Sequence, residues 1–293
     1  MSERRSHIEV ERRGNVGTIV IDRPERFNSM DVETAQDFRR AGLQMARDEH
    51  IRCVVITGTG GVFCSGADLK YIRQGGRSED LGYLQPEVAE PGVGYGERFK
   101  QILEYLHSAI SEIRRAPKPF VAAVDGVAAA GGFGIAMACD LVIASERASF
   151  EWAYHKTGLT GAESSTFFLP RLVGWRKALE LVLLNPRLGA NQALELGLIN
   201  RVLPVDGFWD EVMAIAERIA SGPVAAYGVA KRLLGLAAAE DQLDRHLDLE
   251  LEELVRSADS CEFAEGLAAF FEKRPPRFAF GAGAAVPEVI DGS

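Results

Sequence analysis

The sequence predicts an α/β fold, and two observations support this prediction. First, short runs of β-branched and small apolar residues, typical of buried strands, recur between residues 16 and 144. Second, these runs are separated by longer stretches in which apolar residues recur at helical spacing. With 293 residues, 47% of them hydrophobic, the chain can bury one large core together with a helical appendage.

The predicted elements follow one another in that order along the first half of the chain. Strands are expected where the apolar runs are short: Val16–Asp22, Cys53–Thr57, Phe120–Val124 and Leu141–Ala144. Helices are expected between these strands, at Asp31–Arg47 and Glu97–Arg115. The span Gly75–Gly96 is rich in glycine, proline and acidic residues, which indicates a mobile loop near the entrance to a site.

The pattern becomes helical after about Pro204. Four helices are predicted there: Trp209–Ser221, Val224–Ala239, Gln242–Ala258 and Cys261–Lys273. The chain therefore divides into an α/β core, residues 1–203, and a C-terminal helical region, residues 204–293.

Composition and charge exclude several classes of protein. A formal net charge of -9 and a pI near 5.2 argue against nonspecific nucleic-acid binding, because no basic run stands out. The cysteines lack metal-ligand spacing, so we expect reduced thiols in a cytoplasmic protein, and no metal site: Cys53, Cys64, Cys139 and Cys261. The N-terminus lacks a signal peptide's apolar stretch, and Asp125 and Asp140 interrupt the longest apolar runs, so we expect no membrane association.

Gly131 and Gly132 mark a candidate anion site. They follow an apolar strand and a turn of small residues, and they precede an apolar helix. Backbone N–H groups at a helix N-terminus, together with the helix dipole, favour a negative charge. Close packing is the alternative explanation, because small residues also let two backbones approach.

A second segment, Cys53–Lys70, repeats this pattern. A β-branched strand leads into a glycine-rich turn and then into Ser65-Gly-Ala-Asp68, which can direct a further amide to the same point. Two fixed amides suit an enzyme of acyl transfer or enolate formation, because a carbonyl oxygen that gains charge needs donors already in place. Loss of one such donor typically costs about 3 to 4 kcal/mol of barrier.

These segments resemble the paired oxyanion segments of the crotonase superfamily, also called the enoyl-CoA hydratase/isomerase family. The motifs that carry the resemblance follow in order: Phe63-Cys-Ser-Gly-Ala-Asp-Leu69, Pro117-Lys-Pro-Phe-Val-Ala-Ala-Val-Asp-Gly126, Gly131-Gly132 through Cys139-Asp140, Phe168-Leu-Pro-Arg-Leu-Val-Gly174, Ala193-Leu-Glu-Leu-Gly-Leu-Ile-Asn200 and Glu265-Gly-Leu-Ala-Ala-Phe-Phe-Glu-Lys-Arg274. The resemblance implies a crotonase (ClpP-like) fold of repeated β-β-α units over residues 1–203. It also implies that residues 204–293 join copies of the chain into a homotrimer or a dimer of trimers.

The resemblance further implies an acyl-CoA thioester as substrate, with no cofactor beyond its coenzyme A. The thioester oxygen would lie between the amides of Ala67 and Gly131. The positions that match the family's CoA contacts are Arg26, Ser65, Asp68, Lys70, Phe270 and Lys273. Solvated surface is the alternative for each basic residue, and Asp68 can instead orient its own turn.

The chain departs from the family at the two glutamates that hold water in hydratases. The matching positions are Gly134 and Tyr154. Hydration needs one group that takes a proton from water and another that delivers one to carbon. Glycine does neither, and a tyrosine with a pKa near 10 is at best a weak acid or a positioning donor, so two-glutamate hydration is in doubt.

Glu163 is the remaining candidate base. The isomerase subgroup carries a single acid on the turn that starts at Gly158, and an ungapped count places that acid at Ala162, one residue earlier. A shift of one residue within a turn can still direct Glu163 into the pocket, where burial would raise its pKa. Capping of the following helix is the alternative role, because a carboxylate suits a helix N-terminus.

Tyr154, His155 and His107 are also similar to aromatic and histidine positions of the superfamily's aromatic-acyl-CoA dehalogenase. That relative attacks with an aspartate, whose position is again Ala162. His107 lies on a helix face with Leu103, Leu106 and Ile110, so a core or pocket-wall histidine is favoured over a general base.

The sequence thus predicts an acyl-CoA thioester enzyme of the enoyl-CoA hydratase/isomerase type. Proton-shuttle isomerisation through Glu163 is preferred, and hydration with Tyr154 and Glu163 positioning a water is the next interpretation. A catalytically impaired CoA-binding subunit, or a hydrolase or dehalogenase-like crotonase, remains as the alternative.

Overall fold

The computed structural model describes residues 2–4, 7–75, 94–238 and 241–278, and it contains two sheets. The larger sheet has the strand order β1-β2-β3-β4-β6-β8-β11. Its strands are β1 (Ser2–Arg4), β2 (Ile8–Arg13), β3 (Val16–Ile21), β4 (Cys53–Gly58), β6 (Phe120–Val124), β8 (Leu141–Ser145) and β11 (Arg201–Leu203). The pairs from β3 to β11 are parallel, whereas β1, β2 and β3 pair antiparallel.

The smaller sheet has the order β10-β9-β7-β5 and consists of very short strands. These are β5 (Val62–Cys64), β7 (Val127–Ala129), β9 (Ser149–Glu151) and β10 (Leu188–Gly189). Each of β4, β6 and β8 in the large sheet is followed by β5, β7 and β9 in the small one, and then by a helix. This confirms the predicted repeated β-β-α units.

Glycine makes the passage between the two sheets possible. Gly126 connects β6 to β7 with a φ of 89°. A Cβ atom at Gly126 would lie 1.8 Å from the carbonyl oxygen of Gly61, in the matching β4–β5 turn. A residue with a side chain is therefore excluded here both by backbone conformation and by space.

Helices cover both faces of the large sheet because its strand residues alternate between them. Val54 and Ile56 of β4 face the main core, which α1 (Val32–Arg47) and α3 (Tyr95–Arg115) cover. Cys53 and Val55 face the other way and pack in a second cluster with α8 (Phe208–Ala220). Asp31, predicted as the first residue of α1, is its N-cap and accepts from the Thr34 N–H.

Further helices complete the core around the small sheet. They are α2 (Leu69–Gln74), α4 (Gly131–Ala138), α5 (Ser165–Val173), α6 (Trp175–Leu184) and α7 (Ala190–Glu195). The predicted loop Gly75–Gly96 lies largely outside the described residues, and α3 begins at Tyr95. None of the described helices is long and apolar enough to cross a membrane.

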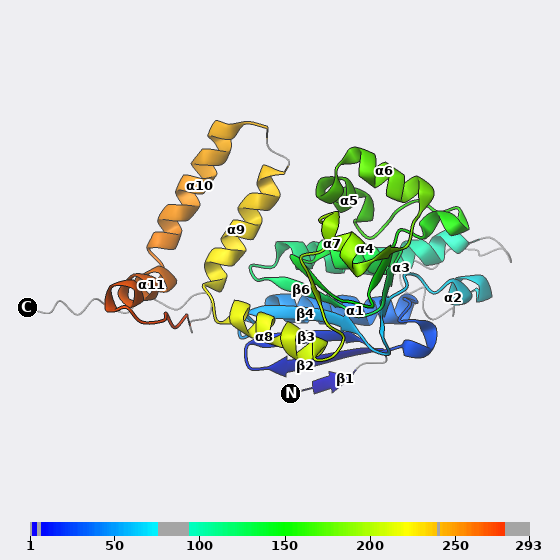
Figure 1. Ribbon diagram of the computed structural model, residues 1–293, viewed down its shortest axis with the longest axis horizontal. Helices are drawn as coiled ribbons and strands as arrows, with labels where there is room; N and C mark the ends of the chain where they lie inside the picture. Colours follow the sequence, from blue (N-terminus) through cyan, green and yellow to red (C-terminus); the bar gives the residue numbers. More distant parts are fainter. Residues whose placement is uncertain (1, 5–6, 76–93, 239–240, 279–293) are drawn as a thin grey trace, which may run out of the picture.

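The C-terminal helices α9 (Val224–Ala237), α10 (Leu243–Ala258) and α11 (Cys261–Glu272) extend away from the sheets (Figure 1). A buried ion pair between Arg52 and Glu262 ties α11 to the start of β4, with a nitrogen–oxygen distance of 3.4 Å. Lys231 of α9 pairs with Asp140 at 2.7 Å. Because α8 packs on the large sheet, the helices that leave the core begin after α8. The division of the chain into two regions at residue 203 stays a prediction.

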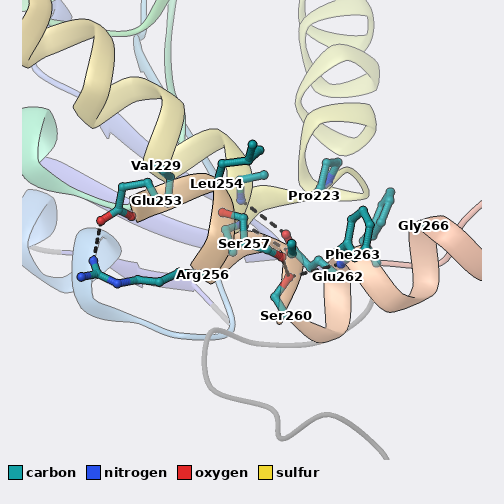
Figure 2. Close-up of a pocket in the computed structure, with 14 residues that line it drawn as sticks. Pro223, Val229, Glu253, Leu254, Arg256, Ser257, Ser260, Glu262, Phe263 and Gly266 are labelled. Atoms are coloured by element: carbon teal, nitrogen blue, oxygen red, sulfur yellow. Dashed lines mark hydrogen bonds and ion pairs between the residues drawn. The ribbon is translucent and has the colours of Figure 1, made fainter. Parts of the chain in front are cut away.

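A pocket of about 430 Å³ lies between these three helices (Figure 2). Figure 2 shows Glu253 and Arg256 of α10 joined by an ion pair at one side of the pocket. Helix α10 carries four exposed leucines, each with between 47% and 70% of its surface exposed, and the last of them also lines the pocket: Leu243, Leu247, Leu251 and Leu254.

Candidate active site

The turn between β7 and α4 presents the amide of Gly131. Gly131 is the first residue of α4, so its N–H group has no acceptor within the helix. The preceding Ala130 has φ 47° and ψ -116°, a conformation that L-residues rarely adopt, and its N–H donates to the Glu151 carbonyl at 3.1 Å. Such strained backbone occurs preferentially at functional sites, and here it directs the first amide of the helix.

The segment after β5 presents the amide of Ala67. Met30 donates to the Gly66 carbonyl and accepts from the Asp68 N–H, both at 2.8 Å. These two bonds form an isolated parallel bridge, and they use the Gly66 carbonyl and the Asp68 N–H, which lie on either side of Ala67. The Ala67 N–H therefore points away from Met30, because successive N–H groups of an extended chain alternate in direction.

The small sheet brings these two turns together. β5 and β7 are parallel neighbours, with Cys64 opposite Ala128, so both turns leave the sheet at the same edge. A Cβ atom added to Gly66 would lie 3.0 Å from the Gly131 nitrogen, and one added to Gly132 would lie 2.0 Å from the Cys64 carbonyl oxygen. Gly132 thus serves close packing, while Gly131 supplies the first amide of α4.

Glu163 lies directly beside Gly131. It precedes α5, with φ 44°, and the next residue, Ser164, has φ 62°. Its side chain is buried, with 2% of the residue exposed, and the Tyr154 hydroxyl donates to its Oε2. Its Oε1 is 2.8 Å from the place where a Cβ atom of residue 131 would lie. The alternative role as a helix cap is wrong, because the carboxyl is directed to Tyr154 and Gly131 and the N-terminus of α5 has no side-chain cap hydrogen bond.

The environment makes Glu163 a titratable group near neutral pH. Burial raises its pKa to about 7, and the hydrogen bond from Tyr154 lowers it in part. Burial and the charge of Glu163 raise the pKa of Tyr154 far above its ordinary value, so Tyr154 acts as a hydrogen-bond donor. A carboxyl whose pKa lies near the working pH suits a general base.

The space for a hydratase glutamate at residue 134 is already occupied. A Cβ atom at Gly134 would lie 2.3 Å from the carbonyl oxygen of Glu163 and 2.8 Å from its Cβ. Real Cβ atoms do not approach other atoms so closely. The absence of a carboxylate at residue 134 is therefore built into the path of the chain around Glu163.

The two histidines near the site differ in their contacts. His107 on α3 is exposed at the edge of the site, and its Nε2 accepts from the Glu163 N–H at 3.3 Å. Partial burial lowers its pKa. The predicted position of His107 in the pocket wall is compatible with this contact. The alternative prediction, a histidine in the core, is wrong because His107 is exposed. His155 is exposed on the short helix η3 (Tyr154–Thr157).

The predicted CoA contacts fall into two separate groups. Arg26, Ser65, Asp68 and Lys70 lie together around the start of α2, where Asp68 is the N-cap and accepts from the Tyr71 N–H. Phe270 and Lys273 lie on and directly after α11, at the opposite end of the longest axis of the molecule (Figure 1). Within one chain, therefore, the structure does not bring them to the other candidates.

Asp68 has less freedom than the sequence suggested. It is buried and accepts from Arg26 Nε at 3.1 Å and from Arg23 Nη1 at 3.0 Å. Burial raises the pKa of Asp68, but the bonds from Arg26 and the Tyr71 N–H outweigh it and hold the pKa below its usual range. Arg23, which the sequence analysis missed, also pairs with Asp31 at 2.8 Å. No local sequence signal distinguishes it from other surface arginines.

Comparison with known proteins shows the family of this chain. The chain matches the family described as enoyl-CoA hydratase/isomerase over residues 11–90 and 94–280. The chain belongs to the enoyl-CoA hydratase/isomerase family. It is 33% identical over 267 residues to 4-chlorobenzoyl coenzyme A dehalogenase-2 of Arthrobacter sp, covering 91% of each chain. It is also 33% identical over 275 residues to 1,2-epoxyphenylacetyl-CoA isomerase of Escherichia coli (strain K12), covering 93% of this chain and 97% of the relative.

Solved structures of the enoyl-CoA hydratase/isomerase family show the same architecture. An enoyl-CoA hydratase from Bacillus anthracis matches with a TM-score of 0.81 and 29% sequence identity, over 94% of this chain and 99% of that one. The predicted crotonase fold and the predicted family are confirmed. This chain combines a buried carboxyl at Glu163 with a filled position 134.

Proposed function

We propose that this chain isomerises the double bond of an enoyl-CoA by moving one proton through Glu163. The single observation that carries the proposal is the buried Glu163 carboxyl beside Gly131, together with the Glu163 backbone, which fills the space that a side chain at position 134 would need. Hydration by two glutamates would need a second carboxylate, for which position 134 has no room, whereas a proton shuttle needs only one carboxylate. No cofactor is required beyond the coenzyme A of the substrate.

The proposed reaction starts at the thioester carbonyl, which accepts from the amides of Ala67 and Gly131. The Glu163 carboxylate takes a proton from the carbon next to the carbonyl, and the electron pair of that C–H bond forms an enolate. The two amides stabilise the charge on its oxygen. The protonated Glu163 then gives the same proton to the far end of the dienolate, so that the double bond moves into conjugation. Tyr154 stabilises the ionised carboxyl between turnovers.

The experiment uses purified protein with 3-enoyl-CoA and 2-enoyl-CoA panels, and it follows double-bond movement and hydration separately. The variants are Glu163→Gln and, as a control, Glu252→Gln, a glutamate with 63% side-chain exposure on α10. We expect Glu163→Gln to lose isomerisation and the control to keep it. Full activity of Glu163→Gln would refute the proposal. Release of free CoA from these substrates would favour the hydrolase alternative, and release of halide from an added 4-halobenzoyl-CoA would favour the dehalogenase alternative.

Exchange of the α-proton gives a second, independent readout. A saturated acyl-CoA in D₂O has no double bond to move, but the protonated Glu163 can exchange the proton it has taken with the solvent and return a deuteron to the α-carbon. We expect exchange with the native chain and none with Glu163→Gln. Binding of acyl-CoA without exchange or turnover of any thioester would favour a CoA-binding subunit that lacks catalysis.

We also propose that the C-terminal helices join copies of the chain into a homotrimer or a dimer of trimers in the cytoplasm. The exposed leucines of α10 support association, and the four free thiols fit a reducing compartment. Phe270 and Lys273 would then reach the CoA site of a neighbouring copy, because they lie far from their own. Native mass spectrometry of the double variant Leu247→Ser and Leu251→Ser tests this proposal. The same number of subunits in the variant as in the native protein would contradict it.

A further inference from the structure

The turn that carries Glu163 has an unusual backbone. Glu163 and Ser164 are consecutive non-glycine residues with φ of 44° and 62°. The left-handed region is unfavourable for L-residues, so neighbouring groups must hold the turn in place. Without them, a return of φ to negative values would rotate the Glu163 side chain away from Gly131.

Three neighbours hold this turn, and each uses a different part of it. The Ser165 N–H donates to the Ala162 carbonyl at 2.9 Å and closes the turn. The Tyr154 hydroxyl donates to the Glu163 carboxyl. His107, on the distant helix α3, accepts from the Glu163 backbone N–H at 3.3 Å through Nε2. Of these three contacts, the bond to His107 is the one made by the Glu163 N–H, at the peptide group where the left-handed conformation begins.

The chemistry of this contact excludes His107 from proton transfer in the same arrangement. An imidazole nitrogen that accepts an N–H bond carries no proton, so the ring proton of neutral His107 lies on Nδ1. The Nε2 lone pair, which a general base would use, is directed at the Glu163 N–H. Partial burial lowers the pKa of His107 and so favours this neutral form.

We infer that His107 is a positioning residue that holds Glu163 in the conformation facing Gly131. The inference rests on the proposed role of Glu163 as the proton-transferring group. His107 acts through the backbone of that residue and needs an acceptor atom, not a titratable ring. A side chain of similar reach with an acceptor oxygen should therefore replace it, and an apolar side chain of similar size should not.

The test compares His107→Gln, which keeps an acceptor, with His107→Leu, which does not. His50→Leu, at an exposed histidine in the turn before β4, is the matched control. We expect His107→Leu to lose about 100-fold in kcat for isomerisation with KM changed less than about threefold, because a displaced catalytic group costs that much. His107→Gln should remain within about tenfold of the native kcat, and His50→Leu should be unchanged.

Two outcomes would overturn the inference. A kcat of His107→Leu within about twofold of the native value would show that the contact does not position Glu163. An equal loss in His107→Gln and His107→Leu would indicate that the imidazole itself transfers a proton. If His107→Leu does not fold, His107→Ala is compared with His107→Gln by the same criteria. Failure of the proposed function is separate, because it appears as full activity of Glu163→Gln whatever the His107 variants do.

Discussion

Replacement of Glu163 by glutamine should stabilise the protein at neutral and alkaline pH. The buried carboxyl has a pKa of about 7 in the folded chain, against 4.5 as its ordinary value. Because the folded state raises this pKa, ionisation opposes folding: the cost is absent below pH 4.5 and complete above pH 7. The difference of pKa corresponds to about 3 kcal/mol, most of which develops between pH 5 and pH 8.

The assay is urea denaturation of the native chain and Glu163→Gln at a series of pH values, at one protein concentration so that any association contributes equally. The free energy of unfolding of the variant should exceed that of the native chain by an amount that grows with pH, by about 2 to 3 kcal/mol from pH 5 to pH 8. Glu252→Gln, which alters an exposed carboxyl, should show no such growth. A difference between Glu163→Gln and the native chain that is independent of pH would refute the reasoning about burial.

Three further results are expected. The kcat/KM of the native chain should rise with pH and level off above about pH 7, since the base must be ionised; a flat profile between pH 5 and pH 8 would contradict a base with this pKa. Tyr154→Phe removes the donor that lowers the pKa of Glu163, so the rising limb of the same profile should move to higher pH, and an unmoved limb would argue against the contact. Gly134→Glu should lower both the melting temperature and isomerase activity, because its Cβ would meet the Glu163 backbone at 2.3 Å; a gain of hydratase activity would show that this turn can yield.

Most of the long elements could be predicted because their patterns are local. The predicted strand Phe120–Val124 has the observed bounds, and the four C-terminal helices begin and end within two residues of the predicted positions. The strands of the small sheet escaped prediction, since runs of two or three residues contain too few positions to show alternation. They matter nonetheless, because the β5–β7 pair aligns the two turns that carry the Ala67 and Gly131 amides.

The sequence by itself determined the family and the fold, and it predicts the amides of Ala67 and Gly131 as donors, because all of these depend on glycines and small residues at set distances from a strand and a helix. It could not determine where the Glu163 carboxyl points. That direction depends on a left-handed backbone that distant groups hold, His107 on α3 and Tyr154 on η3, and no count along the chain reveals such contacts. Tertiary structure alone also decided that position 134 has no space for a second carboxylate and that Phe270 lies away from its own chain's site. Backbone amides are placed by the path of the chain, whereas the direction and pKa of a side chain are set by the residues that surround it.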